Sequence, residues 1–340
     1  MINASSNPVP PHHTSSTAHT EPTMPSAEPD TCRYRLDTDS SATLVLPDGR
    51  KLGYAEYGAP TGQPILYQHG FPGARLEVAP LDQVASKVGA RLIAIDRPGF
   101  GWSSPHKNRT FLSHAQDVEA LANHLKLEHY GVLGVSGGGP YALACARFLP
   151  ADKLRAVSLV CGLGSPDMGY WGMAWPNYLG WTFGQRMFPG LCRWWFGREP
   201  GARLDLSDEE RLARLRQAFE KDKASMHPKD RAVLGDVDFM RVHLRTARES
   251  YGQGMDGFAL DFKVLNSNFG FRIEDIRKDL PIHLWYGRLD TNVPLQHGEK
   301  IAARVGSNAR LIVEEDETHA SIWANFKAEY LGELVTAIKA

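Results

Sequence analysis

The segment that most constrains the fold lies near the middle of the chain, where residues 130–149 read YGVLGVSGGGPYALACARFL. An apolar, β-type run over 130–135 leads directly into a turn of small residues, and a helix-forming run over 141–149 follows. The turn holds the pattern G-x-S-x-G, with Ser136 at its centre. A residue in so tight a reversal has a strained backbone, and glycine neighbours leave room for the chain to pass. The segment therefore predicts a strand, a sharp turn and a helix, with the Ser136 hydroxyl exposed at the turn.

Gly137 lies directly after this serine, at the start of the predicted helix. Unpaired N–H groups and the positive end of the helix dipole meet at such a position, so the Gly137 N–H can stabilise a developing oxyanion. The five-residue pattern alone also occurs in ordinary loops. The strand before it and the helix after it favour a nucleophilic Ser136, provided that the chain also supplies a base and an acid.

The composition limits the classes of partner. A chain of 340 residues is long enough for one large α/β domain or two smaller ones with a substantial core. Its formal net charge of -1 gives no overall field that would attract nucleic acid or an anionic membrane, so we expect a small-molecule substrate. The cysteines, which lack paired spacing, are Cys32, Cys145, Cys161 and Cys192. We expect reduced thiols in a cytoplasmic protein rather than disulfides or a zinc site.

The first 30 residues differ in composition from the rest of the chain. They are rich in Pro, Ser, Thr and His, they lack the apolar stretch of a signal peptide, and no Arg precedes Arg33. We predict a disordered tail over 1–30. His12, His13 and His19 lie in this tail without the spacing of metal ligands, so a metal site there is not favoured.

Short apolar runs alternate with helical patterns over the rest of the chain, which is typical of a mostly parallel sheet covered by helices on both faces. Asp48-Gly49 between the first two runs predicts a β-hairpin. The predicted strands are 42–46, 52–57, 65–68, 91–95, 130–135, 157–161, 282–286 and 311–314, and the predicted helices are 76–88, 110–125, 141–149, 294–305 and 321–338. The predicted fold class is therefore α/β.

This alternation stops over residues 165–264, where helical patterns occur without a comparable strand. We interpret these residues as an inserted helical cap and assign residues 31–164 and 265–340 to the core. Ser207 and Glu210 have the spacing of a capping box, and Asp236 or Asp238 can start a later helix. The uncharged stretch 168–185 contains proline, asparagine and four glycines, so we do not expect a membrane span.

The start of the cap is rich in aromatic residues, and five of the eight tryptophans of the chain lie there. The candidate pocket residues are Trp171, Trp175 and Trp181 in the cap, with Phe100 and Trp102 from the core. An aromatic roof would suit an apolar or aromatic substrate. Packing of the same side chains between cap and core is an equally open interpretation.

A serine hydroxyl needs a base, and the base needs an orienting acid. In a parallel sheet, these partners should lie in loops at the carboxyl ends of later strands, at the edge that exposes Ser136. Asp290 follows the predicted strand 282–286, and His319 follows the last predicted strand. Asp167, after the strand 157–161, is an alternative acid, whereas His227, His243, His283 and His297 lack a comparable loop position.

Several motifs together resemble the α/β-hydrolases, in the large group with an HG-x-P-G loop and an inserted helical cap. They are HGFPG at 69–73, DRPGFG at 96–101, GVSGG at 134–138, GRLD at 287–290 with VP at 293–294, and His319. The resemblance covers roughly residues 40–165 and 270–340, and the chain order Ser, Asp, His is the order of this group. It implies that the Phe71 N–H is the second oxyanion donor beside Gly137. We interpret His69, Asp96 and Arg97 as structural residues of their loops.

The predicted activity is hydrolysis of a carboxylic ester or lactone of a small, largely apolar or aromatic molecule by Ser136, His319 and Asp290, without a metal or cofactor. Proline aminopeptidases of this fold resemble HGGPG, from which Phe71 departs. Epoxide hydrolases and haloalkane dehalogenases have an aspartate in place of Ser136, so both are disfavoured. Carbon–carbon bond hydrolysis stays open, as does a ligand-binding or tailoring protein that does not hydrolyse its ligand.

Overall fold

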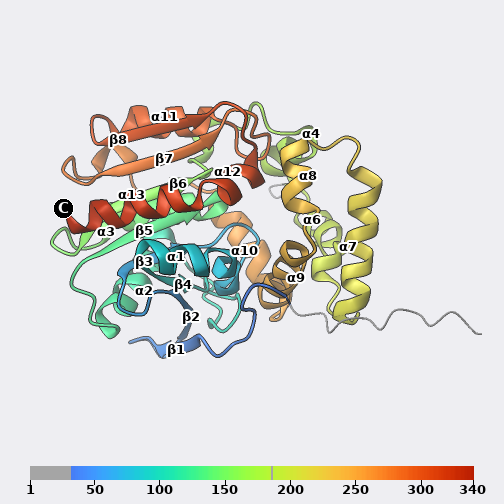
Figure 1. Ribbon diagram of the computed structural model, residues 1–340, viewed down its shortest axis with the longest axis horizontal. Helices are drawn as coiled ribbons and strands as arrows, with labels where there is room; N and C mark the ends of the chain where they lie inside the picture. Colours follow the sequence, from blue (N-terminus) through green and yellow to red (C-terminus); the bar gives the residue numbers. More distant parts are fainter. Residues whose placement is uncertain (1–31, 185–186) are drawn as a thin grey trace, which may run out of the picture. The chain divides into compact units, whose positions relative to one another are not determined.

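One sheet organises the part of the chain that the structure describes, and its strand order is β1-β2-β4-β3-β5-β6-β7-β8 (Figure 1). The computed structural model describes residues 32–184 and 187–340. The predicted tail and its three histidines therefore lie outside the described residues. The strands are β1 (Ser41–Val45), β2 (Lys51–Gly58), β3 (Gln63–Gln68), β4 (Ala90–Ile95), β5 (Tyr130–Val135), β6 (Leu154–Val160), β7 (Ile282–Gly287) and β8 (Ala309–Glu314).

Most of this sheet is parallel. Strand β2 runs antiparallel to β1 and β4, and every other neighbouring pair runs parallel. The predicted hairpin is confirmed, with Val45 opposite Lys51. Because β5, β6, β7 and β8 are parallel neighbours, the loops that follow their carboxyl ends meet at one edge of the sheet.

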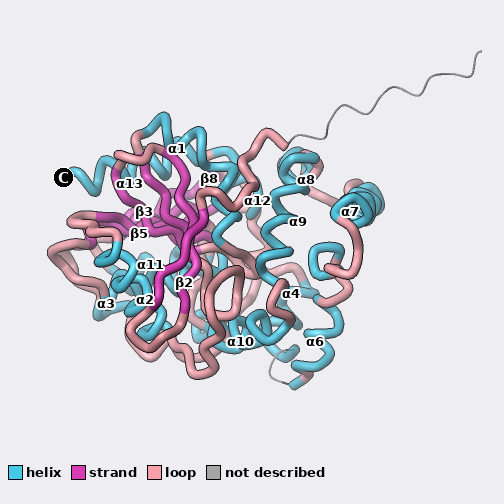
Figure 2. The backbone as a smooth tube through the Cα atoms, turned by 90° about the horizontal axis from the view of Figure 1, so that it is seen from below, coloured by secondary structure: helices cyan, strands magenta, loops and turns pink. Residues whose placement is uncertain are grey.

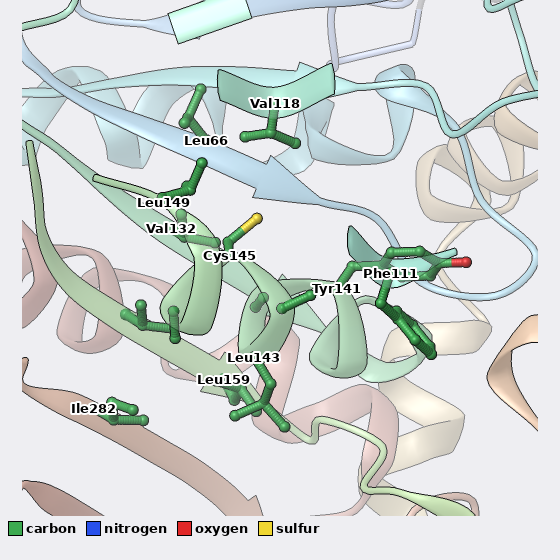
Figure 3. Packing of buried hydrophobic residues seen from close by; sticks show 14 of the residues in the cluster. Leu66, Phe111, Val118, Val132, Tyr141, Leu143, Cys145, Leu149, Leu159 and Ile282 are labelled. Carbon is green, nitrogen blue, oxygen red and sulfur yellow. The ribbon is translucent and has the colours of Figure 1, made fainter. Parts of the chain in front are cut away.

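Helices cover both faces of the sheet, as the alternating pattern predicts. Successive side chains of a strand point to opposite faces. Val132 of β5 belongs to the buried cluster in Figure 3 with Leu143, whereas the next residue, Leu133, packs in a second cluster with Leu334. The first face carries α2 (Phe111–His124), α3 (Gly139–Phe148) and α11 (Gln296–Val305), and the second carries α1 (Asp82–Val88), α12 (His319–Asn325) and α13 (Lys327–Lys339).

The described part of residues 165–264, which we continue to call the cap, holds helices and no strand. Figures 1 and 2 both show α7, α8 and α9 gathered at one side of the sheet. The predicted capping box of Ser207 and Glu210 starts α7, and Asp236 caps α9. The helices are α4 (Trp175–Leu179), α6 (Pro189–Phe196), α7 (Asp208–Asp222), α8 (Pro228–Leu234), α9 (Val237–Tyr251) and α10 (Met255–Leu265).

Short 3-10 or π turns link these elements, and two predicted helices differ from the observed ones. The predicted helix 76–88 begins with a 3-10 turn that contains Pro80, which lacks the N–H that an α-helix needs. The predicted helix 321–338 is divided at Phe326 into α12 and α13. The short turns are η1 (Arg75–Leu81), η2 (Ser136–Gly138), η3 (Pro166–Met168), η4 (Gly180–Gly184), η5 (Pro200–Ala202) and η6 (Ile273–Asp275). Across the described residues, no helix combines the length and the apolar character needed to span a bilayer.

A buried carboxylate ties α10 to the core. Asp261 is fully buried, and it accepts hydrogen bonds from Arg97 Nε at 3.0 Å, Arg109 Nη2 at 2.9 Å and the Tyr141 hydroxyl at 2.6 Å. Both arginines are buried as well. Two buried cations therefore share one anion, and loss of that anion would leave their charges uncompensated.

We predict that Asp261→Asn lowers the free energy of unfolding by about 3–5 kcal/mol, because it breaks a buried ion pair from one side. Asp256→Asn is a matched control on the same helix, since Asp256 also pairs with an arginine, Arg193, but its side chain is 88% exposed. This control should cost at most about 1 kcal/mol. Urea unfolding followed by circular dichroism measures both, and equal midpoints for the two variants would contradict the prediction.

Candidate active site

The predicted strand, sharp turn and helix around Ser136 are present. Strand β5 ends at Val135, the turn η2 begins at Ser136, and α3 begins at Gly139. Ser136 has a φ of 51°, in the left-handed region that residues other than glycine rarely adopt. A Cβ on Gly138 would lie 2.1 Å from the Gln68 carbonyl oxygen, so only glycine fits there. The tight packing of this turn fixes the direction of the Ser136 side chain.

The structure brings together the three residues predicted for catalysis. His319 Nε2 lies 3.0 Å from Ser136 Oγ, and His319 Nδ1 lies 2.7 Å from Asp290 Oδ2. The other oxygen of Asp290 accepts the N–H groups of Asn292 and Val293, each at 2.8 Å. The carboxylate is therefore held by its own loop, and it can orient the imidazole with Nε2 toward the serine.

The Asp290 carboxylate stabilises the positively charged form of His319. Burial alone would lower the pKa of His319, but the adjacent Asp290 carboxylate raises this pKa well above its usual value. The Cys161 sulfur lies 3.9 Å from His319 Nε2, and burial raises the pKa of this thiol. The thiol is therefore neutral near pH 7, and Asp290 is the charge that stabilises the imidazolium.

The two backbone positions predicted to supply the N–H donors to an oxyanion, Phe71 and Gly137, lie beside each other. A Cβ on Gly137 would lie 3.1 Å from the Phe71 nitrogen, so the two backbone segments are adjacent. Neither of these N–H groups donates a hydrogen bond to another described residue. Both positions thus fit the predicted oxyanion donors.

The loop that carries Phe71 is fixed from below by buried polar side chains. Arg97 donates to the carbonyl oxygens of His69 and Gly70 at 2.6 and 2.7 Å. His69 accepts the Arg97 N–H at 3.3 Å, and burial lowers the pKa of His69 well below its usual value, so it is neutral. Asp96 accepts the N–H groups of Arg75 and Trp102 in the neighbouring turn, and burial raises the pKa of Asp96 to about 6. These residues hold loops, as the sequence predicts.

Two cavities meet at Ser136. The larger, of about 480 Å³, has core residues on one side and α8, α9 and the end of α6 on the other. The smaller, of about 290 Å³, extends toward α4 and α10. Residues that line both include Phe71, Ser136 and His319. A bound substrate can therefore extend in two directions from the serine.

Only one of the five predicted pocket residues lines either cavity. Trp181 lines the smaller one and packs against Phe262, with ring centroids 4.8 Å apart. The other four predicted pocket residues line neither cavity. Phe100 is fully buried against His69, and Trp102 lies under the Arg75 guanidinium. Trp171 and Trp175 lie on the surface of the cap, where they are 79% and 73% exposed. The aromatic pattern does not show which side of a short helix faces the core, because that depends on neighbouring elements.

The alternative triad acid lies elsewhere. Asp167 is paired with Arg304 at 2.5 Å on the surface, away from His319. Among the described residues, one cluster of side chains has the spacing that a metal site would require. It consists of Cys161, Asp290 and His319, whose possible metal-binding atoms lie within 4.8 Å of one another. Both ring nitrogens of His319 are already engaged by Ser136 and Asp290, however. The group is therefore arranged for proton transfer.

Several polar residues of the larger cavity were not predicted from the sequence. They are Glu77, Cys161, Glu199, Asp230 and His243. Cys161 comes directly after β6, at the carboxyl edge of the sheet, so its position gave a usable signal. His243, which lacks a suggestive loop position in the sequence, lines the cavity from α9, and only the packing of the cap reveals this.

The family model described as the alpha/beta hydrolase fold matches residues 63–326. The chain belongs to this family. It is 30% identical over 273 residues to a proline iminopeptidase of Xanthomonas citri, covering 75% of this chain and 82% of that protein. The match to a proline iminopeptidase of Arabidopsis thaliana, at 31% identity, covers 36% of this chain and only 33% of that protein. An esterase structure from Exiguobacterium antarcticum superposes with a TM-score of 0.57 at 17% identity, covering 88% of this chain and 99% of that chain. This last likeness concerns the fold.

We predict that Asp290→Asn lowers the pKa of His319, because the carboxylate that stabilises the imidazolium is lost. The ring-proton NMR signals of His319, assigned with a His319→Gln variant, should then titrate at lower pH than in the wild type. Asp316→Asn is the control: Asp316 lies three positions before His319 but is exposed, and its loss should leave the titration unchanged. Equal titration midpoints in wild type and Asp290→Asn would contradict the assigned role.

Proposed function

We propose that this protein is a serine hydrolase that cleaves carboxylic esters or lactones of small, largely apolar molecules. The observation that carries the proposal is the continuous chain of two hydrogen bonds from Asp290 through His319 to Ser136, at the junction of two cavities. The unused N–H groups of Phe71 and Gly137 beside it supply the second requirement, stabilisation of negative charge on the carbonyl oxygen.

In the first half of the proposed reaction, Ser136 Oγ attacks the substrate carbonyl carbon while His319 Nε2 takes the hydroxyl proton. The carbonyl oxygen becomes an oxyanion that accepts hydrogen bonds from Phe71 and Gly137. His319 then gives its proton to the leaving alkoxide, and the acyl group remains on Ser136. Asp290 stabilises the transient imidazolium, which agrees with the direction in which it raises the pKa of His319.

In the second half, a water molecule takes the place of the alcohol. His319 removes a proton from this water as its oxygen attacks the acyl carbon, and the same two N–H groups stabilise the second oxyanion. The proton then returns to Ser136 Oγ, and the carboxylic acid leaves. The imidazole of His319 accepts and donates every proton that moves in this cycle. The cycle therefore needs no further acid or base beyond the three side chains that lie together.

The cavity walls support an apolar substrate. Phe71, Trp181 and Phe262 line the smaller cavity, with Phe71 stacked on Phe262 at a centroid distance of 5.5 Å. The buried Phe258 packs behind them, 4.8 Å from Phe71. Such a wall suits an acyl chain or an aromatic ring, whose transfer out of water is favourable. Carbon–carbon bond hydrolysis requires the same three residues and stays an alternative chemistry within this proposal.

Aminopeptidase activity is the second candidate, because the iminopeptidase of X. citri matches most of the chain. An aminopeptidase must bind a free, cationic amino terminus, and the carboxylates of Glu77, Glu199 and Asp230 line the larger cavity. Phe71 favours ester hydrolysis instead, because it places a bulky ring where the iminopeptidase-type loop has a glycine. Measured preference between an ester and a prolyl amide decides between them.

The test combines labelling with a substrate panel. We expect a fluorophosphonate to label the wild type and not Ser136→Ala, and we expect this variant to lose at least about 10⁴-fold in kcat for ester hydrolysis, since the nucleophile is removed. Aryl esters of increasing acyl length and prolyl arylamide are compared at equal concentration. Absence of labelling dependent on Ser136 would contradict the serine-hydrolase proposal, and faster cleavage of the amide than of every ester would favour the aminopeptidase.

A further inference from the structure

Glu77 is a carboxylate on the wall of the larger cavity whose two oxygens have different surroundings. Oε1 accepts the Gly70 N–H and the Tyr67 hydroxyl, each at 2.8 Å. Oε2 has no hydrogen-bond donor among the described residues, although Glu77 lines the cavity that contains Ser136. One oxygen thus fixes the side chain in place, and the other is left available.

Glycine positions in the loop locate Oε2 relative to the reacting serine. A Cβ placed on Gly70 would lie 3.3 Å from Glu77 Oε2 and 3.7 Å from Ser136 Cβ. A Cβ on Gly73 would lie 2.4 Å from the same oxygen. A side chain on Gly70 would therefore occupy the space beside both the serine and Oε2. In the proposed reaction, atoms next to a scissile carbonyl would lie in this space.

Among the described residues, no lysine or arginine forms an ion pair with Glu77, although the charges of Arg97 and His319 act on its carboxylate. The described residues that line the larger cavity include Glu199 and Asp230 but no lysine or arginine. Arg97, the nearest guanidinium under the loop, is engaged by Asp261 and by the carbonyl oxygens of His69 and Gly70. Burial raises the pKa of Glu77, and the hydrogen bonds from Gly70 and Tyr67 with the charges of Arg97 and His319 offset this effect only in part. A donor supplied by the substrate would compensate it.

We propose that Glu77 is a specificity-determining residue, whose Oε2 accepts a hydrogen bond from a hydroxyl or ammonium group on the carbon next to the scissile carbonyl. The proposal rests on the proposed function and names its substrate class: esters of 2-hydroxy or 2-amino acids. The anchoring of Oε1 prevents the carboxylate from turning away, so the geometry of recognition is fixed before the substrate binds.

The test compares phenyl esters that differ at one group. Phenyl 2-hydroxybutanoate has a donor, and phenyl 2-methoxybutanoate has a similar inductive effect without one. After correction for alkaline hydrolysis rates, we expect the wild type to prefer the hydroxy ester by about 10- to 100-fold in kcat/KM, as a hydrogen bond to a charged group would give. Glu77→Gln should reduce this ratio at least tenfold, since the glutamine oxygen can still anchor Gly70 while the amide presents a donor to the cavity. A general loss of activity caused by movement of the loop would lower kcat/KM for both esters alike, so it would leave the ratio of the two values unchanged.

Phenyl 2-aminobutanoate distinguishes the two kinds of donor. If Glu77→Gln lowers the kcat/KM of the hydroxy ester relative to the methoxy ester, the recognised group is a neutral hydroxyl donor. If only the kcat/KM of the amino ester falls relative to the methoxy ester, the recognised group is an ammonium. Glu199→Gln is the charge-matched control, because it removes the same charge from the cap side of the cavity. It should leave the ratio of hydroxy to methoxy ester unchanged.

An unchanged ratio in Glu77→Gln for both donor esters would overturn the proposal and leave Glu77 with only the anchoring of its loop. An equal fall of the hydroxy-to-methoxy ratio in Glu199→Gln would overturn it as well, since the effect would then come from general cavity charge. Fluorophosphonate labelling of each variant separates these outcomes from failure of the proposed function. A variant that is labelled at Ser136 but has lost its selectivity supports the role of Glu77, whereas a wild type that is not labelled contradicts the hydrolase itself.

Discussion

The two hydrogen bonds of His319 are the interaction on which the candidate site depends. They join residues that follow three different strands, β5, β7 and β8, and they form only because these strands end at the same edge of one sheet. The distances of 2.7 and 3.0 Å on either side of the ring leave little room for displacement. A shift of any one loop would therefore break the path by which a proton leaves the serine.

A second set of contacts links the HGFPG loop, residues 69–73, to the cap. Arg97 holds the carbonyl oxygens of His69 and Gly70 and also pairs with Asp261 of α10. The Thr318 hydroxyl, next to His319, donates to Asp230 of α8 at 2.5 Å. One helix at the smaller cavity, α10, and one helix at the larger cavity, α8, are thus bonded to loops of the candidate site. This arrangement couples the shape of the cavity to the geometry of the serine, and Glu77 adds a polar contact on the core side.

The sequence predicted the parts of the structure that follow from local patterns and from chain order. Strand β5 was predicted with its observed bounds, because an apolar run between clear turn signals leaves little choice. Asp290 and His319 were found by their positions after late strands, which the parallel topology brings together. The pocket was predicted poorly: Trp171 and Trp175 are exposed, whereas Trp181, a few residues later, lines a cavity. Glu77 was missed because its position at the cavity depends on how the loop folds over it, and a single glutamate between Leu76 and Val78 in a predicted helix gives no such signal.

Capture of the acyl-enzyme tests most directly whether these three side chains work as one unit. The protein is mixed with an aryl ester, quenched in acid during the first turnovers, digested and analysed by mass spectrometry. We expect the peptide that contains Ser136 to gain the mass of the acyl group, and we expect Asp290→Asn to form this peptide far more slowly. Turnover of the ester without an acylated Ser136 peptide, or acylation of another residue such as Cys161, would contradict the proposed catalysis.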